Sequence, residues 1–268
     1  MQNRPQIVGI VNITGDSFSD GGQFLKPTAA IDHARSLIAA GADFVELGPA
    51  SSNPDAVLLS AEDQIERLAP VLNELSTDKV PLSVDATNSA VLEFAIDAKV
   101  AMLNDIRGFS DPALHDRLAD CDARLVVMHS LLERERAARN NATPEQVLAS
   151  IDRFFETRLG ELVRAGVPEE RLIVDPGMGF FLGNDPKASI AVLQRIPELK
   201  ARFGCPIFIS VSRKSFLRAI TGRAIEDIGP ATLAAELYAA REGATYLRTH
   251  DVLALGDALK TVEALRSV

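Results

Sequence analysis

The sequence predicts an α/β fold, a single (β/α)8 TIM barrel formed by residues 1–268. Short apolar runs rich in β-branched residues alternate with longer amphipathic runs, and the alternation repeats eight times without an interdomain linker. The length of 268 residues matches the ~250 residues typical of such a barrel. Since no G-x-G-x-x-G motif follows the first apolar run, an open dinucleotide-binding sheet is the less favoured alternative.

The expected strands are short apolar runs that can be buried on both faces of a parallel sheet. The pairs Gly41-Ala42 and Gly243-Ala244 end helices directly before the second and eighth of these runs. The strands are expected at residues 6–12, 43–47, 81–85, 100–104, 124–128, 171–175, 206–211 and 245–248.

The runs between the strands carry apolar residues at helical spacing and polar residues on the opposite face. Helices are expected at residues 28–40, 61–74, 89–98, 112–119, 144–165, 186–203, 215–220, 231–241 and 254–265. The charged stretch 134–141 has few apolar residues, so we expect a solvated loop or the start of a helix there.

Composition narrows the choice of partner and compartment. The formal net charge of -9 repels phosphate backbones, so nucleic acid is a poor candidate partner, although a local basic cluster can still bind a small anion. Cys121 and Cys205 lie far apart and form no metal-binding spacing with His, which favours unpaired thiols in a reducing compartment. No apolar stretch approaches the ~20 residues of a membrane span. A cytoplasmic protein without a membrane partner is therefore expected.

Polar side chains follow nearly every expected strand. The carboxyl ends of barrel strands meet at one rim, where the active sites of such barrels lie. Any one of these residues alone could be a helix cap, but their coincidence favours a polar pocket. The residues are Asn12, Asp85, Asn104-Asp105, Met128-His129, Asp175, Ser212-Arg213-Lys214 and Arg248-Thr249-His250.

These residues fall into two chemical groups. Asp85, Asn104 and Asp175 suit a flat heterocycle with adjacent N–H donors, which a carboxylate binds with two charge-assisted hydrogen bonds. The basic residues of the later strands, with the hydroxyls of Ser212 and Ser215, suit a phosphate or pyrophosphate. The segment from Asn12 to Gly22 is either a mobile loop that covers the site or an ordinary βα loop, and its composition alone does not separate the two.

At this point the motifs resemble the dihydropteroate synthases of folate synthesis over essentially the whole chain. The segment from Asn12 to Gly22 is similar to that family's first loop, although the family usually has Pro where Gly15 stands. The later motifs match in order: Ser83-Val84-Asp85, Leu103-Asn104-Asp105, Asp175-Pro176-Gly177-Met178-Gly179-Phe180, Ser212-Arg213-Lys214-Ser215 and Arg248-Thr249-His250.

The resemblance implies a pterin-binding domain, a transferase activity, two substrates and roles for particular residues. A pterin pyrophosphate and p-aminobenzoate would be the substrates, Mg²⁺ the cofactor and a homodimer the assembly. The pterin ring would be held by Asp85, Asn104, Asp175 and Lys214, with Met128 packing near it. The pyrophosphate would be held by Asn12, Arg248 and His250, with Asn12 also helping to place Mg²⁺. Phe180, Lys214 and Ser215 would border p-aminobenzoate, and Asp16, Phe18 and Asp20 would lie on a first loop that closes over the site and takes part in catalysis with Lys214.

Two segments depart from the family pattern. The second loop, usually Gly-Gly-Glu-Ser-Thr-Arg-Pro-Gly, has Ala50 in place of the glutamate and Asn53 in place of the arginine. After Phe180 the chain continues with Phe181-Leu182-Gly183, about two residues more than the usual pattern before the next helix. Both departures resemble the sulfonamide-insensitive branch of the family. We therefore expect Phe181 to narrow the p-aminobenzoate pocket so that bulkier sulfonamides clash, the alternative being that it only packs the rim.

Two other functions remain open from the sequence. A pterin-dependent methyltransferase shares the aspartate and asparagine contacts to the ring, but it has no need of the basic motifs around Lys214 and Arg248. A non-catalytic pterin-binding paralogue is kept open by the changes in the second loop, although Lys214 and Arg248 are both present.

Overall fold

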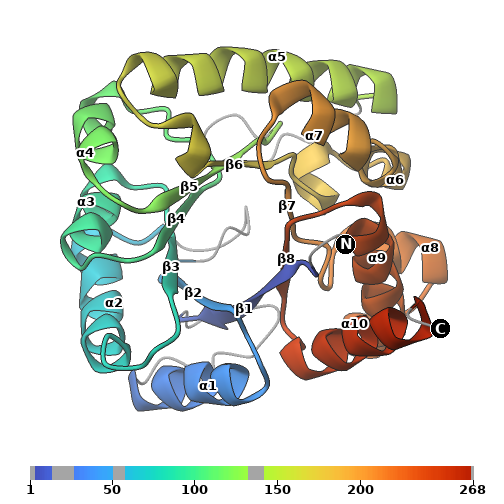
Figure 1. Ribbon diagram of the computed structural model, residues 1–268, viewed down its shortest axis with the longest axis horizontal. Helices are drawn as coiled ribbons and strands as arrows, with labels where there is room; N and C mark the ends of the chain where they lie inside the picture. Colours follow the sequence, from blue (N-terminus) through green and yellow to red (C-terminus); the bar gives the residue numbers. More distant parts are fainter. Residues whose placement is uncertain (1–3, 14–26, 51–57, 132–141, 267–268) are drawn as a thin grey trace.

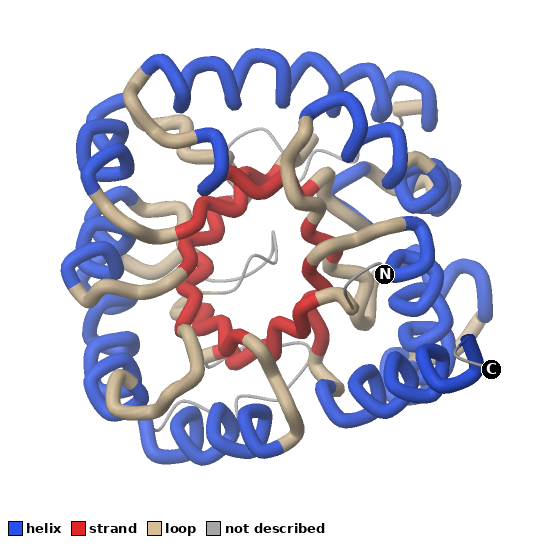
Figure 2. Tube along the Cα trace, viewed as in Figure 1, coloured by secondary structure: helices blue, strands red, loops and turns tan. Residues whose placement is uncertain are grey.

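Eight parallel strands surround the centre of the molecule and the helices form an outer ring, as Figures 1 and 2 show. The computed structural model describes residues 4–13, 27–50, 58–131 and 142–266. The strands are β1 (Gln6–Asn12), β2 (Phe44–Gly48), β3 (Leu82–Asp85), β4 (Met102–Asp105), β5 (Arg124–Met128), β6 (Leu172–Asp175), β7 (Phe208–Ile209) and β8 (Tyr246–Thr249). They pair in the order β6-β5-β4-β3-β2-β1-β8-β7, and a parallel bridge between Val174 and Ile207 closes the ring. The predicted (β/α)8 barrel is confirmed.

The outer ring follows the predicted helices. It consists of α1 (Pro27–Ala39), α2 (Ala61–Leu75), α3 (Ser89–Asp97), α4 (His115–Asp120), α5 (Pro144–Arg164), α6 (Pro186–Gln194), α7 (Ile196–Phe203), α8 (Ser215–Thr221), α9 (Gly229–Glu242) and α10 (Val252–Arg266). Short 3-10 turns are η1 (Pro112–Leu114), η2 (Glu169–Arg171), η3 (Gly179–Leu182) and η4 (Ile225–Asp227). None of the helices in the described part of the chain is long and apolar enough to cross a membrane.

The single helix predicted at residues 186–203 is wrong, because the structure has two helices there. Residues 186–203 form α6 and α7 rather than one helix, with Arg195 between them at φ -95° and ψ 1°. Pro197 lies in the first turn of α7, where its missing N–H costs no hydrogen bond, whereas inside a continuous helix it would break one. The helix predicted at 112–119 starts as the 3-10 turn η1, and α4 begins only at His115. The other elements begin and end within about two residues of the prediction, which is the usual uncertainty of such boundaries.

Local sequence signals set where several helices begin and end. Ser60 and Asp63 form a reciprocal capping box at the start of α2, and Thr143 and Gln146 form another at the start of α5. Gly204 ends α7 in the left-handed conformation that glycine adopts without a Cβ clash.

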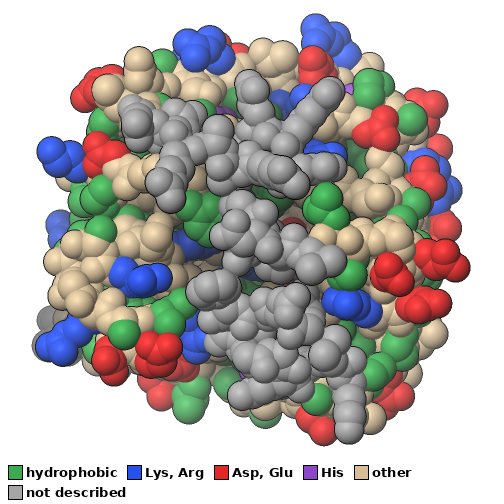
Figure 3. Space-filling model, turned by 180° about the vertical axis from the view of Figure 1, so that it is seen from behind, with side chains coloured by type: hydrophobic (Ala, Val, Ile, Leu, Met, Phe, Trp, Pro, Cys, Tyr) green, Lys and Arg blue, Asp and Glu red, His purple; other side chains and the backbone are tan. Residues whose placement is uncertain are grey.

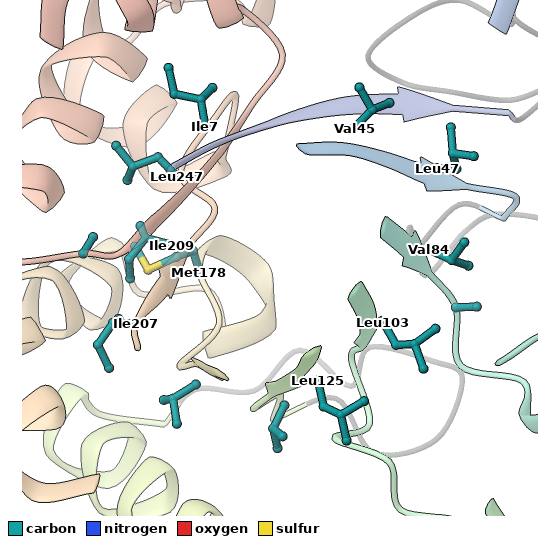
Figure 4. Packing of buried hydrophobic residues seen from close by; sticks show 14 of the residues in the cluster. Ile7, Val45, Leu47, Val84, Leu103, Leu125, Met178, Ile207, Ile209 and Leu247 are labelled. Atoms are coloured by element: carbon teal, nitrogen blue, oxygen red, sulfur yellow. The ribbon is translucent and has the colours of Figure 1, made fainter. Parts of the chain in front are cut away.

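Strand residues alternate between two apolar clusters. Figure 4 shows the outer set, including Val45, Leu103 and Leu247, which packs between the strands and the helices. The inner set fills one end of the ring with Val8, Phe44, Met102, Val126, Ile173, Phe208 and Tyr246. Arg124 of β5 donates to the Tyr246 hydroxyl of β8 at 2.6 Å, a contact that spans this interior.

Polar residues follow the inner apolar set along the same strands. Glu46, Asn104 and Arg248 come two residues after Phe44, Met102 and Tyr246, so they point to the same side of the sheet. The interior is therefore apolar toward the amino ends of the strands and polar toward their carboxyl ends, where the site was predicted.

Candidate active site

A buried carboxylate, Glu46, joins three strands at the polar end of the barrel. Its side chain is fully buried, and Oε2 accepts hydrogen bonds from Ser83 Oγ at 3.0 Å and from Asn104 Nδ2 at 3.3 Å. Its Oε1 accepts from Arg248 Nε, and Arg248 Nη2 also donates to Asp85 Oδ2 at 3.1 Å. The structure thus brings the predicted residues Asp85, Asn104 and Arg248 into one network.

Two aspartates at strand ends carry raised pKa values. Burial raises the pKa of Asp175 to about 6, although the Gly177 N–H, which donates to its Oδ1 at 2.8 Å, opposes the shift. Burial and the Glu46 carboxylate raise the pKa of Asp85, while Arg248 opposes. Both groups are held as strong acceptors that hydrogen-bond donors on a ligand would stabilise.

Lys214 supplies the neighbouring cation. Burial lowers its pKa to about 8, with a further contribution from Arg248, while Asp175 and Asp85 oppose the shift. Gly179 approaches it closely, because a Cβ there would lie 3.3 Å from both Cβ and Cδ of Lys214. Gly179 also has a φ of +66°, which favours glycine, so the loop after β6 and the loop after β7 meet at a position that a larger residue would strain.

His250 and Ser212 form the end of the site at β7 and β8. Ser212 Oγ lies 2.9 Å from His250 Nδ1 and accepts from the His250 backbone N–H at 3.3 Å. Burial and the cations Arg213, Arg248 and Lys214 lower the pKa of His250 well below its ordinary value, so its ring is neutral. The contact between Ser212 Oγ and Nδ1 holds the imidazole ring in place, and a neutral ring carries one N–H that can donate to an anion.

Two aromatic rings lie against Lys214 in η3. The Phe180 and Phe181 centroids are 4.5 Å apart, and Lys214 Nζ lies 4.7 Å from the Phe181 centroid and 5.7 Å from that of Phe180. Phe181 is buried and its carbonyl accepts from the Leu131 N–H at 2.9 Å, whereas Phe180 is only partly buried. Ser215 begins α8 as an exposed residue, and Met128 ends β5 in the buried interior.

Other predicted residues have structural positions or lie outside the described residues. Asp105 is a turn residue, since its carboxylate accepts from the N–H groups of Arg107 and Phe109 at 2.9 and 2.7 Å. Asp16, Phe18, Asp20 and Asn53, together with the stretch 134–141, lie outside the described residues.

Asn12 ends β1 with a half-buried amide, and a Cβ on Gly48 would lie 3.5 Å from its Oδ1. No group of three His, Cys, Asp or Glu side chains in the described residues could hold a metal ion. Mg²⁺ commonly takes few protein ligands and completes its shell with substrate phosphates and water. The Asn12 amide oxygen fits that pattern as one ligand.

Sequence reasoning missed two residues of this region. Glu46 lies inside a strand rather than at its end. A carboxylate in the apolar run Phe44-Val45-Glu46-Leu47 could nevertheless have indicated a buried polar network, because a buried charge needs a partner. Arg67 of α2 donates from Nη1 to the carbonyls of Ile13 and Pro49, both at 3.3 Å, and so joins the segments that follow β1 and β2. Its position on an amphipathic helix gave no sign of this contact.

The site as a whole presents acceptors and donors side by side, since Arg248 contacts Asp85 directly. Asp85, Asn104 and Asp175 present oxygen acceptors suited to a heterocycle with several N–H groups, beside the charged Lys214. Arg248 and His250 provide donors for an anion. On the face in Figure 3, the Lys and Arg side chains of the described residues are interspersed with Asp and Glu and form no broad basic patch. The anion-binding groups are therefore a small cluster on a surface of mixed charge.

Comparisons with known proteins agree with this chemistry. The family model described as "Pterin binding enzyme" matches residues 8–250. The chain is 52% identical over 260 residues to a dihydropteroate synthase type-2 of Escherichia coli, covering 97% of this chain and 96% of the relative. It is 49% identical over 260 residues to a type-3 enzyme of Escherichia coli, covering 97% and 99%.

Solved structures give the same result. A Xanthomonas albilineans dihydropteroate synthase with 4-aminobenzoic acid superposes with a TM-score of 0.89 at 35% identity, covering 100% of this chain and 95% of that chain. A Yersinia pestis dihydropteroate synthase in a sulfonamide drug complex superposes with a TM-score of 0.91 at 30% identity, covering 100% and 96%. With the family model matching most of its length and these relatives aligning along nearly all of it, the chain belongs to the pterin-binding enzymes and, among them, to the dihydropteroate synthases.

Proposed function

We propose that this chain joins 6-hydroxymethyl-7,8-dihydropterin pyrophosphate to p-aminobenzoate, giving 7,8-dihydropteroate and pyrophosphate. The observation that carries the proposal is the cluster of Asp85, Asn104, Asp175 and Lys214, which offers acceptors for a ring rich in N–H groups beside one cation. The relatives named above are all dihydropteroate synthases, so neither a pterin-dependent methyltransferase nor a non-catalytic paralogue is favoured.

The ring-binding roles follow from hydrogen-bond chemistry. Asp175 and Asp85 accept from ring N–H groups, which restores the charged form that burial disfavours. Asn104 Oδ1 accepts a further N–H, Lys214 donates to a ring acceptor, and Met128 packs against the ring.

The pyrophosphate is bound by the donors of Asn12, Arg248 and His250. Mg²⁺, held by the Asn12 amide oxygen and by phosphate oxygens, would neutralise part of the leaving group's charge. Arg248 and the ring N–H of His250 stabilise the charge that develops as the C–O bond to the exocyclic methylene breaks.

The second substrate lies beside the ring. Phe180, Lys214 and Ser215 border p-aminobenzoate, with its amine facing the methylene carbon, and Asp16, Phe18 and Asp20 belong to the segment that closes over both substrates. The electron-rich ring bears the developing positive charge, the arylamine nitrogen forms the new C–N bond, and its proton passes to solvent. The protein's contribution is to position the two substrates and to stabilise the leaving group.

The direct test of this reaction is product formation. Purified protein is incubated with Mg²⁺, 6-hydroxymethyl-7,8-dihydropterin pyrophosphate and p-aminobenzoate, and both dihydropteroate and pyrophosphate are followed. Equal amounts of the two products support the reaction. Binding of the pterin pyrophosphate without release of pyrophosphate would favour the non-catalytic paralogue instead.

Substitution of either Lys214 or Asp175 tests the ring-binding roles. Hydrogen bonds to charged groups contribute about 1.5–3 kcal/mol. We therefore expect Lys214→Ala and Asp175→Ala each to lower kcat/KM for the pterin substrate at least tenfold. Steady-state kinetics measure this change, and near-normal turnover in either variant would refute that residue's role.

We also propose that the enzyme discriminates against sulfonamides through Phe181. The Phe181 ring packs against the Phe180 ring and the Lys214 ammonium, and the hydrogen bond from the Leu131 N–H restrains the Phe181 backbone. The ring therefore has little freedom to move aside for a bulkier ligand. p-Aminobenzoate is smaller than a substituted sulfonamide and would still enter. This is selection by steric exclusion rather than by a new attraction.

Replacement of Phe181 by a smaller residue tests the discrimination. Phe181→Ala should lower the inhibition constant of sulfamethoxazole at least tenfold, because the space the ring occupies becomes available. The KM for p-aminobenzoate should change much less. Inhibition of the unaltered enzyme as strong as that of an ordinary bacterial dihydropteroate synthase would contradict the proposal before any variant is made.

We further propose that the chain acts as a homodimer in the cytoplasm. Three large apolar side chains support the dimer, since Ile220, Tyr238 and Leu253 are exposed on α8, α9 and α10, which adjoin one another in Figure 1. Closed twofold dimers are the commonest assembly of soluble oligomers.

A further inference from the structure

Glu46 is a buried carboxylate to which the roles proposed above assign nothing. Its fully buried side chain accepts three hydrogen bonds, from Ser83 Oγ, Asn104 Nδ2 and Arg248 Nε. A buried carboxylate is stable only with such partners, and each partner is held in place in return. Two of the three, Asn104 and Arg248, face the proposed substrate.

The contact with Asn104 fixes the direction of an amide group. A carboxylate only accepts hydrogen bonds, so the Asn104 NH₂ must face Glu46, and the reverse orientation would set Oδ1 against the Glu46 oxygens. Asn104 is 3% exposed, and its Oδ1 is buried with no hydrogen-bond partner in the described part of the chain. An unpaired buried acceptor is costly, and a ligand N–H at this point would satisfy it.

The contact with Arg248 fixes a second group. Because Glu46 holds Nε, the guanidinium lies with Nη2 on Asp85 at 3.1 Å. Arg248 and Asp85 come from β8 and β3, which lie on either side of β1 and β2, so Glu46 supports a side-chain contact between two strands that do not pair with each other.

We infer that Glu46 is a positioning residue that sets which atoms of the pocket accept and which donate. It turns Asn104 Oδ1 toward the substrate and holds Arg248 against Asp85, so the pocket selects a heterocycle with an N–H donor at the Asn104 position. The inference rests on the proposed binding of the pterin ring by Asn104.

The variant Glu46→Gln tests this assignment with almost no change in volume. A glutamine offers one acceptor and an NH₂ group to three donors, so at least one donor loses its partner. Relief comes from rotation of the Asn104 amide, which turns its NH₂ toward the ligand, or from release of Arg248. The affinity for 6-hydroxymethylpterin, a ring without pyrophosphate, should fall at least tenfold by titration calorimetry, whereas KM for p-aminobenzoate should change less than threefold.

The matched control is Ser83→Ala. Ser83 also donates to Glu46, but the proposed site gives it no contact with a substrate. Ser83 is as fully buried as Glu46, so this variant matches the loss of a buried hydrogen bond. It should keep its affinity for 6-hydroxymethylpterin within threefold of the unaltered protein. Equal losses of affinity in the two variants would mean that Glu46 supports the fold only, which overturns the inference.

A double-mutant cycle shows whether Glu46 acts through Asn104. In an Asn104→Ala background, Glu46→Gln should reduce ring affinity by less than threefold, since the amide it orients is gone. A full tenfold effect in that background would mean that Glu46 acts without Asn104, which overturns the inference that Glu46 selects the heterocycle by orienting this amide. If Asn104→Ala binds 6-hydroxymethylpterin weakly and Glu46→Gln binds it normally, only the inference about Glu46 is rejected. If Asn104→Ala binds it normally, the proposed contact between Asn104 and the pterin ring is rejected as well.

Discussion

At the scale of single residues, His129 shows how a buried group organises the loop after β6. Its Nδ1 lies 3.2 Å from the Pro176 carbonyl, which only accepts, so Nδ1 carries the proton and Nε2 accepts from Ser150 Oγ at 3.1 Å. Gly177 is needed next to it, because its φ is +77° and a Cβ there would lie 2.4 Å from the His129 carbonyl oxygen. This packing holds the backbone that follows Asp175.

His129 should make the fold sensitive to mild acid. Burial lowers its pKa to about 4 from an ordinary 6.5. Because the folded pKa is depressed, the neutral ring contributes its full stability above pH 6.5, and this is lost as pH falls toward 4. A shift of roughly 2.5 pKa units corresponds to about 3 kcal/mol. The free energy of unfolding, measured in urea between pH 7 and 4.5, should fall less steeply in His129→Gln than in the unaltered protein.

Ser150→Ala is the control for that measurement. It removes the partner of Nε2 but leaves the titrating ring, so it should lower stability at every pH without flattening the acid slope. Identical slopes for His129→Gln and the unaltered protein would show that another group causes the loss.

At the scale of elements, α9 supports two of the loops that form the anion-binding side. Thr232 Oγ1 accepts from the Arg213 N–H at 3.3 Å, and Arg213 has a φ of +59°, a left-handed conformation that is unfavourable for a residue with a side chain. One helical turn later, the buried Glu236 is hydrogen-bonded to the Thr249 side chain of β8, and its Oε1 has no partner among the described residues. The helix thereby connects the ends of β7 and β8.

Glu236 should weaken the fold as pH rises. Burial raises its pKa to about 8, with Asp251 adding to the shift, whereas the hydrogen bond with Thr249 opposes it. A raised folded pKa means that the protonated form contributes fully below pH 4.5, and its stability is lost progressively until pH passes 8. Relative to Glu236→Gln, the unaltered protein should lose about 1.4 kcal/mol per pH unit between pH 5 and 8.

Urea unfolding of the two proteins at pH 5, 6.5 and 8 measures this difference. Thr232→Val serves as the comparison on the same helix, since it removes a hydrogen bond to the loop after β7 but no titrating group. A constant difference between Glu236→Gln and the unaltered protein across this range would mean that Glu236 is ionised in the fold throughout.

The same elements show what the sequence could and could not predict. The barrel was predictable because eight apolar runs and their helix signals are local features, and the strand ends named most of the residues at the site. Glu46 and Glu236 were missed because burial of a carboxylate depends on neighbours distant in sequence, such as Arg248 and Thr249. Asp105 and Asp175 both end strands and both accept from the N–H two residues later, but the second oxygen of Asp105 also accepts from the Phe109 N–H, a difference set by the local course of the backbone.

At the scale of the whole molecule, the outer surface of α8, α9 and α10 differs from that of a fully solvated barrel. Ile220 is 57% exposed and Leu253 is 59% exposed, and the exposed Tyr238 belongs to α9, which packs against both of their helices. Exposed apolar residues scattered singly are common, but on adjoining helices they suit an interface between two copies of the chain. Leu58, 72% exposed just before the start of α2, belongs to none of these three helices.

The expected assembly is therefore a dimer whose interface includes these three helices. Light scattering after gel filtration should give about twice the chain mass of 28.8 kDa. The double variant Ile220→Glu with Leu253→Glu should shift the protein to the monomer mass, because burying two unpaired carboxylates in an interface is strongly unfavourable. Leu58→Glu adds the same kind of charge elsewhere and should remain dimeric. A monomer mass for the unaltered protein at micromolar concentration would reject the dimer, and a dimer that survives the double variant would place its interface on another face of the barrel.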